Sequence, residues 1–266
     1  MIDFINNSNP VIAALIATMF TYAVTVLGAA LVFFFKKVNK NIMDAMLGFA
    51  AGVMIAASFF SLLAPSINMA ESLNMIPWLI ASIGFFSGGV LLFIGDKIFD
   101  YFANKKQNSD STKLKRCLML VTSISIHNIP EGMAVGVAFG SLAYNLAGAT
   151  PLAAVLLTLG IGLQNFPEGT AVSVPLRREG LSRKKAFFWG QFSGLLEPIA
   201  GVIGALLVVK IQIMLPFLLA FAAGAMIYVV VQELIPESQT NEKKDLMALF
   251  TLIGFSVMMI LDVALG

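Results

Sequence analysis

The feature that most constrains this chain is a succession of apolar runs, separated by short segments that hold charged residues or clusters of Pro, Asn and Ser. A transmembrane helix needs about 20 predominantly apolar residues. The runs predict eight transmembrane helices, at residues 10–35, 42–64, 77–98, 116–142, 150–176, 186–209, 214–236 and 246–264. Only 12% of the 266 residues are charged, about half the usual share of a globular domain. The chain therefore has too few charged side chains to cover the surface of a soluble protein. We therefore expect one all-α integral membrane domain over residues 1–266.

The distribution of basic residues predicts the orientation in the lipid bilayer. Every Lys and Arg except Lys210 lies at or beside a link that follows the first, third, fifth or seventh predicted helix. Basic residues favour the cytoplasmic side, so these links are expected inside and both termini outside. The N-terminus lacks the basic flank of a secretory signal, so the first run is expected to remain as a span of a multi-pass protein. A net charge of +2 argues against a nucleic-acid partner.

Two internal repeats organise the chain. Residues 48–66 (GFAAGVMIAASFFSLLAPS) and 220–238 (AFAAGAMIYVVVQELIPES) share FAAG-M-I and end alike, yet they would cross the membrane in opposite directions. Residues 127–135 (HNIPEGMAV) and 164–172 (QNFPEGTAV) share the frame [HQ]-N-x-P-E-G-x-A-V on consecutive, antiparallel helices. Inverted repeats with a midmembrane site are a common plan of transporters. The pattern predicts a 3+2+3 inverted-repeat arrangement.

Three acidic residues, Glu131, Glu168 and Glu197, lie well inside predicted spans, and no Lys or Arg lies at matching depth. A charged side chain at the bilayer centre is disfavoured by about 2.5–3.5 kcal/mol, so protons or cations must offset these carboxylates. Proline lies beside each of the three glutamates and is expected to kink its helix and to free a backbone carbonyl there.

Polar side chains accompany the glutamates at helical spacing. In both Pro-Glu-Gly frames, the two residues that open the frame lie three and four positions before the glutamate, so the three side chains project from one helix face. Counted at about 1.5 Å per residue, both frames and the third glutamate reach mid-membrane depth. Carboxylate, amide and imidazole ligands suit Zn²⁺, Fe²⁺ or Mn²⁺, and facing glutamates could bridge two ions. The candidate ligands are His127, Asn128, Glu131, Gln164, Asn165, Glu168 and Glu197.

These paired frames and the eight spans resemble the ZIP family of divalent-metal transporters, in its bacterial GufA-like branch, over essentially the whole chain. The resemblance implies a midmembrane, often binuclear, metal site between the fourth and fifth helices. It implies Glu197 on the sixth helix and Met54 on the second as further ligands. It also implies a bacterial plasma (inner) membrane and an exit site at Asp96, Gln232 and Glu233. From the residues alone, Asp96 and Glu233 also fit ordinary interfacial charges at the ends of their helices. Ser61 and Asn68 are expected near the outer approach, whereas Asp44 and Asp262 are expected to be interfacial.

The chain departs from the common family pattern in its single histidine, with Gln164 and Gln232 where many relatives have His. Few imidazole ligands weaken the expected preference for zinc and favour harder ions such as Mn²⁺ or Fe²⁺. The family resemblance still makes zinc the first choice of cargo, and Fe²⁺, Mn²⁺ or Cd²⁺ also fit. We expect uptake into the cytoplasm, with no prosthetic group and no enzymatic activity. A GxxxG face at Gly84 and Gly88 suits close contact within one protomer or in a homodimer.

Two other functions use the same residues. An intramembrane metal-dependent hydrolase would activate water on bound Zn²⁺, but no HExxH motif occurs in the sequence. A proton-coupled carrier of organic solutes would use the glutamates without metal, and equilibrium metal binding would distinguish it.

Overall fold

The computed structural model describes residues 8–34, 39–104, 112–144, 149–178, 180–210 and 212–265. All elements within these ranges are helical. They are α2 (Pro10–Phe34), α3 (Lys40–Ala57), η1 (Ser58–Leu63), α4 (Ala64–Ser72), α5 (Pro77–Asn104), α6 (Thr112–Ser141), α7 (Pro151–Arg178), α8 (Arg183–Ser193), α9 (Leu196–Lys210), η3 (Gln212–Met214), α10 (Leu215–Val229), η4 (Val230–Leu234), α11 (Ile235–Ser238) and α12 (Lys244–Leu265). Because α3–η1–α4, α8–α9 and α10–η4–α11 are near-continuous, the described elements form eight long rods and one short 3₁₀ turn.

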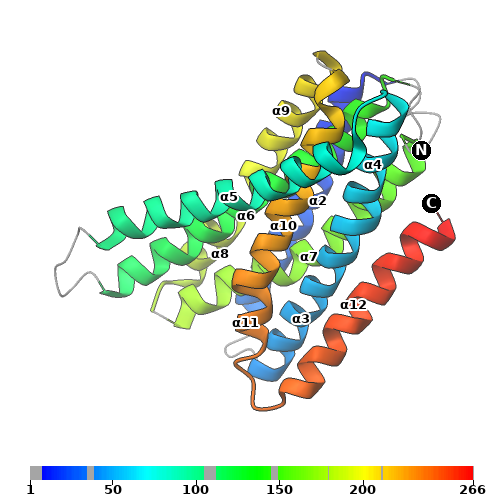
Figure 1. Cartoon of the computed structure of the whole chain (residues 1–266). Coiled ribbons are helices and arrows are strands. Elements are labelled where there is room, and N and C mark those ends of the chain that lie inside the picture. Colours follow the sequence, from blue (N-terminus) through cyan, green and yellow to red (C-terminus); the bar gives the residue numbers. More distant parts are fainter. Residues whose placement is uncertain are drawn as a thin grey trace.

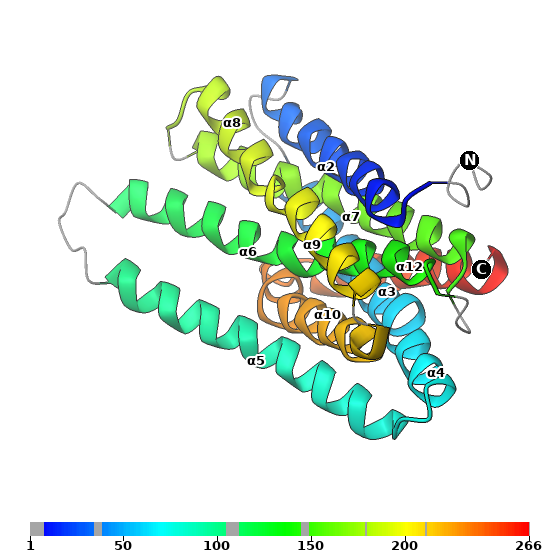
Figure 2. The same ribbon diagram turned by 90° about the horizontal axis from the view of Figure 1, so that it is seen from above.

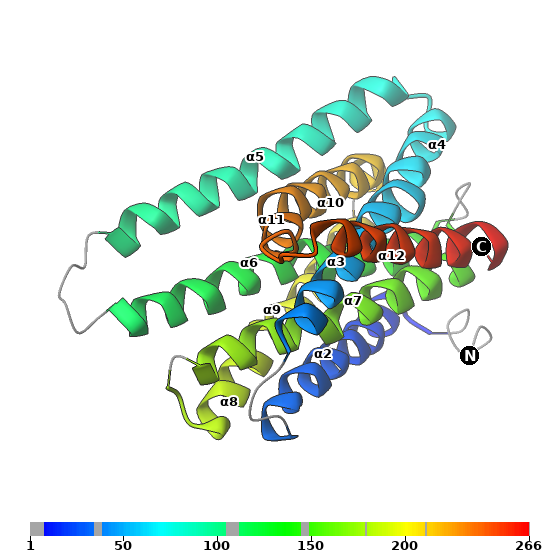
Figure 3. The ribbon, with the colours of Figure 1, turned by 90° about the horizontal axis from the view of Figure 1, so that it is seen from below.

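The rods form one bundle, in which α5 and α6 extend to one side at a clear angle to α3, α10 and α12 (Figure 1). The start of α2 and the end of α12 lie at one end, and the starts of α6 and α8 lie at the other (Figures 2 and 3). We name these the outer end and the inner end, after the orientation expected from the basic residues.

Six of the rods are long and apolar enough to cross a membrane, counted over the described residues. They are Pro10–Phe34, Lys40–Ser72, Pro77–Ile98, Arg183–Val209, Leu215–Ser238 and Lys244–Ala264. The other two, α6 and α7, have 30 and 28 residues and hold the two polar frames. Both pack among other helices: α6 contacts α9, α10 and α2, and α7 contacts α2 and α3. All eight rods are thus long enough to span, and the two most polar ones lie inside the bundle.

Glycines of the two Pro-Glu-Gly frames bring helix pairs into backbone contact. A Cβ added at Gly132 of α6 would lie 2.1 Å from the carbonyl oxygen of Glu197 on α9. A Cβ at Gly169 of α7 would likewise lie 2.1 Å from the carbonyl oxygen of Thr25 on α2. Only glycine permits such approaches. The frames therefore fix the α6–α9 and α2–α7 pairs at the depth of the acidic residues.

The second rod is longer than the expected 42–64, because the chain stays helical through Ser72. The π-helical segment η1 runs directly into α4, and Pro65 in the first turn of α4 lacks the N–H that would bond back into η1. Prolines Pro130 and Pro167 lie within continuous helices, as membrane helices allow where neighbours satisfy the backbone. Only the rod that holds Pro198 is interrupted, between α8 and α9.

Candidate metal centre

Side-chain amides of α7 bind carboxylates of two neighbouring helices in the middle of the bundle. Nε2 of Gln164 donates a hydrogen bond to Oε1 of Glu131 on α6, over 2.6 Å. Nδ2 of Asn165 donates to Oε2 of Glu197 on α9, over 2.8 Å. All four residues are completely buried. The adjacent residues Gln164 and Asn165 of α7 thus each bind one carboxylate, from α6 and from α9 respectively.

A third carboxylate, Glu168, belongs to the same cluster. It lies one turn after Gln164 and Asn165 on α7 and is only 5% exposed. Because Glu168 lies four residues after Gln164, its side chain projects from the same face of α7 as the amide that binds Glu131. Like charges so close together in a medium of low polarity repel one another strongly. The arrangement is one that a cation would stabilise.

Four oxygens of this cluster are buried and have no hydrogen-bond partner among the described residues. They are Oε2 of Glu131, Oε1 of Glu197, Oε1 of Gln164 and Oδ1 of Asn165. A buried polar atom without a partner costs about 1–3 kcal/mol, so four together require an explanation. Carboxylate and carbonyl oxygens are ligands for divalent cations. The open oxygens therefore form a donor set that a metal ion would satisfy.

Acidic side chains alone do not complete this set. Among the described side chains, no group of three or more His, Cys, Asp or Glu is arranged to hold an ion. The amide oxygens of Gln164 and Asn165 lie beside the carboxylates and extend the donor set. Asn128 is fully buried on α6 close to the cluster, and Met54 is fully buried within the apolar core. The backbone of His127 belongs to α6, but its side chain lies outside the described part, so its predicted role stays a prediction.

A cavity of about 460 Å³ leads from the cluster toward the inner end. Its lining includes Glu168, Gln232 and Glu233, and it continues to Met43 and Thr240 near the end of the bundle. Two of the three predicted exit residues thus share one cavity with a carboxylate of the centre. The third, Asp96, does not line this cavity. It lies on α5, where its Oδ2 accepts a hydrogen bond from the Tyr228 hydroxyl over 2.9 Å.

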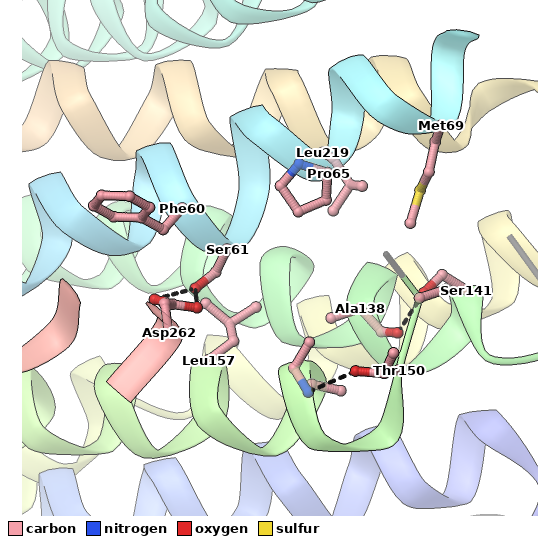
Figure 4. A pocket seen from close by; sticks show the side chains of 13 residues that line it. Phe60, Ser61, Pro65, Met69, Ala138, Ser141, Thr150, Leu157, Leu219 and Asp262 are labelled. Carbon is pink, nitrogen blue, oxygen red and sulfur yellow. Dashed lines mark hydrogen bonds between the residues drawn. The ribbon is translucent and has the colours of Figure 1, made fainter. Parts of the chain in front are cut away.

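A smaller cavity, of about 50 Å³, lies near the outer end, between η1, α4, α6, α7, α10 and α12 (Figure 4). The Ser61 hydroxyl and the Asp262 carboxylate face each other in it, and Oγ lies 2.8 and 2.9 Å from the two carboxylate oxygens. Asn68 is exposed and is not part of this lining. Of the two residues expected near the outer approach, Ser61 therefore lines this cavity and Asn68 does not.

Known proteins resemble this chain over most of its length. The family model described as ZIP zinc transporter matches residues 8–117 and 113–262. The chain belongs to the ZIP family. It is 38% identical over 340 aligned positions to zinc transporter ZIP11 of Xenopus tropicalis, covering 98% of this chain and all of the relative. It is 37% identical to zinc transporter ZIPB of Bordetella bronchiseptica, with 92% and 79% covered. It is 30% identical to zinc transporter GufA of Myxococcus xanthus, with 96% and 99% covered.

The assignment to the ZIP family, made from the paired frames, is confirmed. The similar proteins include an animal protein as well as bacterial ones, so the resemblance extends beyond the bacterial branch. The named relatives are transporters, so this ZIP protein is a membrane transporter rather than an enzyme. The hydrolase alternative is thereby wrong.

Two aspartates of this ZIP protein do not behave as expected from the sequence. Asp262 is not a plain interfacial charge, since it pairs with Ser61 inside the outer cavity. Asp262 could have been recognised from the sequence as unusual, because it is the only charged residue within the apolar run 246–264. Asp44 is 1% exposed and also not at the surface. Its Oδ2 accepts from Nδ2 of Asn241 over 2.8 Å, and its carbonyl oxygen accepts from the Ser238 hydroxyl, so it joins the start of α3 to the end of α11.

Proposed function

We propose that this ZIP protein carries a divalent transition metal, zinc first, across the plasma membrane into the cytoplasm. The observation that carries the proposal is the set of four buried oxygens without partners at the centre of the bundle. They come from three helices, so an ion bound there would join α6, α7 and α9. The zinc transporters that the chain resembles point to the same cargo.

The path that we propose runs through both cavities. An ion enters at Ser61 and Asp262, sheds its water, binds the central oxygens, and leaves along Gln232 and Glu233. The inner cavity is the larger one and reaches Glu168, which supports an arrangement open toward the inner end. The basic residues put that end in the cytoplasm and both termini outside. Because carboxylates must be ionised to bind a metal, we expect uptake to fall in acid.

The same residues support a binuclear centre and a wider choice of ion. The Gln164–Glu131 pair and the Asn165–Glu197 pair each leave two open oxygens. Glu168 projects from the same face of α7 one turn further along, where its two oxygens could bridge two ions. An oxygen-rich set also accepts Fe²⁺, Mn²⁺ or Cd²⁺, since carboxylate and carbonyl ligands do not select strongly for zinc.

We also propose that the chain is built as a 3+2+3 inverted repeat. The π-helical segments η1 and η4 each begin four residues after the matching methionines Met54 and Met226. Close helix contacts repeat as well. A Cβ at Gly254 of α12 would lie 2.0 Å from the carbonyl oxygen of Phe49, and one at Gly88 of α5 would lie 2.0 Å from that of Phe221. Phe49 and Phe221 open the two FAAG segments, so equivalent helix pairs pack through equivalent residues.

Uptake by purified protein in proteoliposomes tests the proposal. We expect the unmodified protein to take up Zn²⁺, measured with a trapped fluorescent indicator, and Fe²⁺, Mn²⁺ and Cd²⁺ by elemental analysis. Glu168→Gln should abolish uptake because it removes a charge from the centre. The matched control is Glu71→Gln, an exposed glutamate of α4, which should transport normally. Uptake that survives Glu168→Gln, or a protein that moves none of these ions, would refute the proposal.

A further inference from the structure

The two inverted repeats correspond residue by residue, and two hydrogen bonds between them show the register. The Ser66 hydroxyl of α4 donates to the carbonyl oxygen of Pro216 at the start of α10, over 2.6 Å. The Ser238 hydroxyl at the end of α11 donates to the carbonyl oxygen of Asp44 in α3, over 2.9 Å. The two serines occupy the same place in the two repeats, and so do Asp44 and Pro216. The same contact is therefore made twice, once toward each end of the bundle.

The helices that pack on these segments, α5 and α12, correspond in the same register. A Cβ at Gly52 of α3 would lie 1.9 Å from the carbonyl oxygen of Thr251 on α12. A Cβ at the equivalent Gly224 of α10 would lie 1.8 Å from that of Phe85 on α5. Thr251 of α12 thus matches Phe85 of α5.

This register makes the entrance and the exit equivalent places of the two repeats. Asp262 follows Thr251 by as many residues as Asp96 follows Phe85, so these two aspartates match. Ser61 follows the methionine of the first FAAG segment by as many residues as Glu233 follows that of the second. An aspartate on the outer helix and a polar residue in a π-helical segment therefore recur at both ends.

The two ends differ in the partner of the aspartate. At the outer end, the Ser61 hydroxyl lies 2.8 and 2.9 Å from the two carboxylate oxygens of Asp262 (Figure 4). At the inner end, Oδ2 of Asp96 accepts a hydrogen bond from the Tyr228 hydroxyl over 2.9 Å. Asp96 does not line the inner cavity, whereas Glu233 does. The inner aspartate is thus held in a different place from its outer counterpart.

Tyr228 has no equivalent hydroxyl in the first repeat. The matching residue there is Ala56, which is completely buried and has no side-chain donor. Tyr228 lines an apolar groove of about 400 Å³ between α5 and α10. Gln232, one turn later, lines both this groove and the inner cavity. The Tyr228 hydroxyl therefore binds Asp96 directly beside the exit.

We propose that Tyr228 is a positioning residue of the exit, whose hydroxyl keeps the Asp96 carboxylate out of the inner cavity. The inference rests on the proposed function. An ion that leaves along Glu233 then does not meet Asp96 as an additional ligand. A further carboxylate binds a divalent cation more tightly, and transport requires binding weak enough for the ion to leave. Without the hydroxyl, Asp96 turns toward Glu233 as Asp262 turns toward Ser61, and an ion between the two carboxylates offsets their repulsion.

The test uses Tyr228→Phe in the full-length protein, which removes only the hydroxyl. Two quantities are measured: Zn²⁺ uptake into proteoliposomes, and the release of Zn²⁺ from preloaded protein to a chelator by stopped flow. We expect the maximal rate of uptake to fall by about tenfold, as is typical when an orienting partner is lost, without a rise in KM. We expect the release to be slower. A merely destabilised protein would release Zn²⁺ faster, so the sign of the change separates the two explanations.

Two further variants complete the experiment. Adding Asp96→Asn to Tyr228→Phe removes the charge of the freed side chain and should recover most of the lost rate. Tyr144→Phe is the matched control, because the Tyr144 hydroxyl donates to the carbonyl oxygen of Val209 at the outer end of the bundle, over 2.7 Å. It should transport normally.

Four results would overturn the inference: an unchanged maximal rate in Tyr228→Phe, faster release from it, no recovery on adding Asp96→Asn, or an equal loss in Tyr144→Phe. Glu168→Gln, measured in parallel, separates this inference from the proposed function. If Glu168→Gln abolishes uptake while Tyr228→Phe transports normally, only the role of Tyr228 is wrong. If the unmodified protein takes up no Zn²⁺, the proposed function fails and the inference fails with it.

Discussion

Replacing Gly132 with alanine should displace Glu197 and disable the centre. The added Cβ would lie 2.1 Å from the carbonyl oxygen of Glu197 and 2.9 Å from its Cα, so α9 must move away by about 1 Å. Binding sites need their ligands held within about 0.5 Å, so such a shift is large. We expect Zn²⁺ affinity to fall by at least about tenfold. Overpacking should also lower the free energy of unfolding by about 1–3 kcal/mol.

Two alanine variants separate the site from general packing. At Gly95 of α5 an added Cβ meets nothing within 4 Å, so Gly95→Ala should leave stability and uptake unchanged. At Gly224 of α10 it would lie 1.8 Å from the carbonyl oxygen of Phe85, so Gly224→Ala should destabilise the α5–α10 pair away from the centre. Equilibrium Zn²⁺ binding and thermal unfolding in detergent report the two effects. If Gly132→Ala binds Zn²⁺ as well as Gly224→Ala does, the close approach does not position Glu197.

Three further substitutions test other parts of the structure. Asp262→Asn should raise the KM for Zn²⁺ uptake without changing equilibrium binding at the centre, because it removes charge only from the outer cavity; an unchanged KM would contradict its role at the entrance. Asn241→Ala should lower the free energy of unfolding by about 1–3 kcal/mol, measured by thermal unfolding, because buried Asp44 loses a donor. Gln164→Leu should destabilise the metal-free protein, whereas Gln164→Leu with Glu131→Leu should recover stability and still bind no Zn²⁺.

Much of the architecture could be predicted from the sequence because the membrane imposes strong rules. Apolar runs set the spans, and basic residues alternate from link to link. Polar residues within a span are rare enough to mark the centre without a structure, so the sequence predicts Glu131, Gln164, Asn165 and Glu197 as ligands. The structure brings these four residues together.

The pairing of these residues could not be predicted, because it depends on contacts between helices. Helical spacing places Gln164 beside Glu168 of its own helix, yet its amide binds Glu131 of α6. Thr21 is a common residue in an apolar run and carries no motif, so its contact with Asn165 emerges only when α2 packs on α7. Ser61 and Asp262 are likewise joined by tertiary packing across about two hundred residues.

The most polar rods, α6 and α7, are tolerated in the membrane for the same reason that they can bind a cation. Within the described residues neither counts as an apolar span, and both pack against several other helices. Enclosure removes water, which leaves the open oxygens of Glu131 and Glu197 without partners and makes their charges costly. The same loss of water strengthens their attraction for an ion. Replacing the Glu131–Gln164 pair by apolar residues would relieve this cost and would remove the cation site at the same time. The buried charges that destabilise the metal-free protein are therefore the same charges that bind the metal.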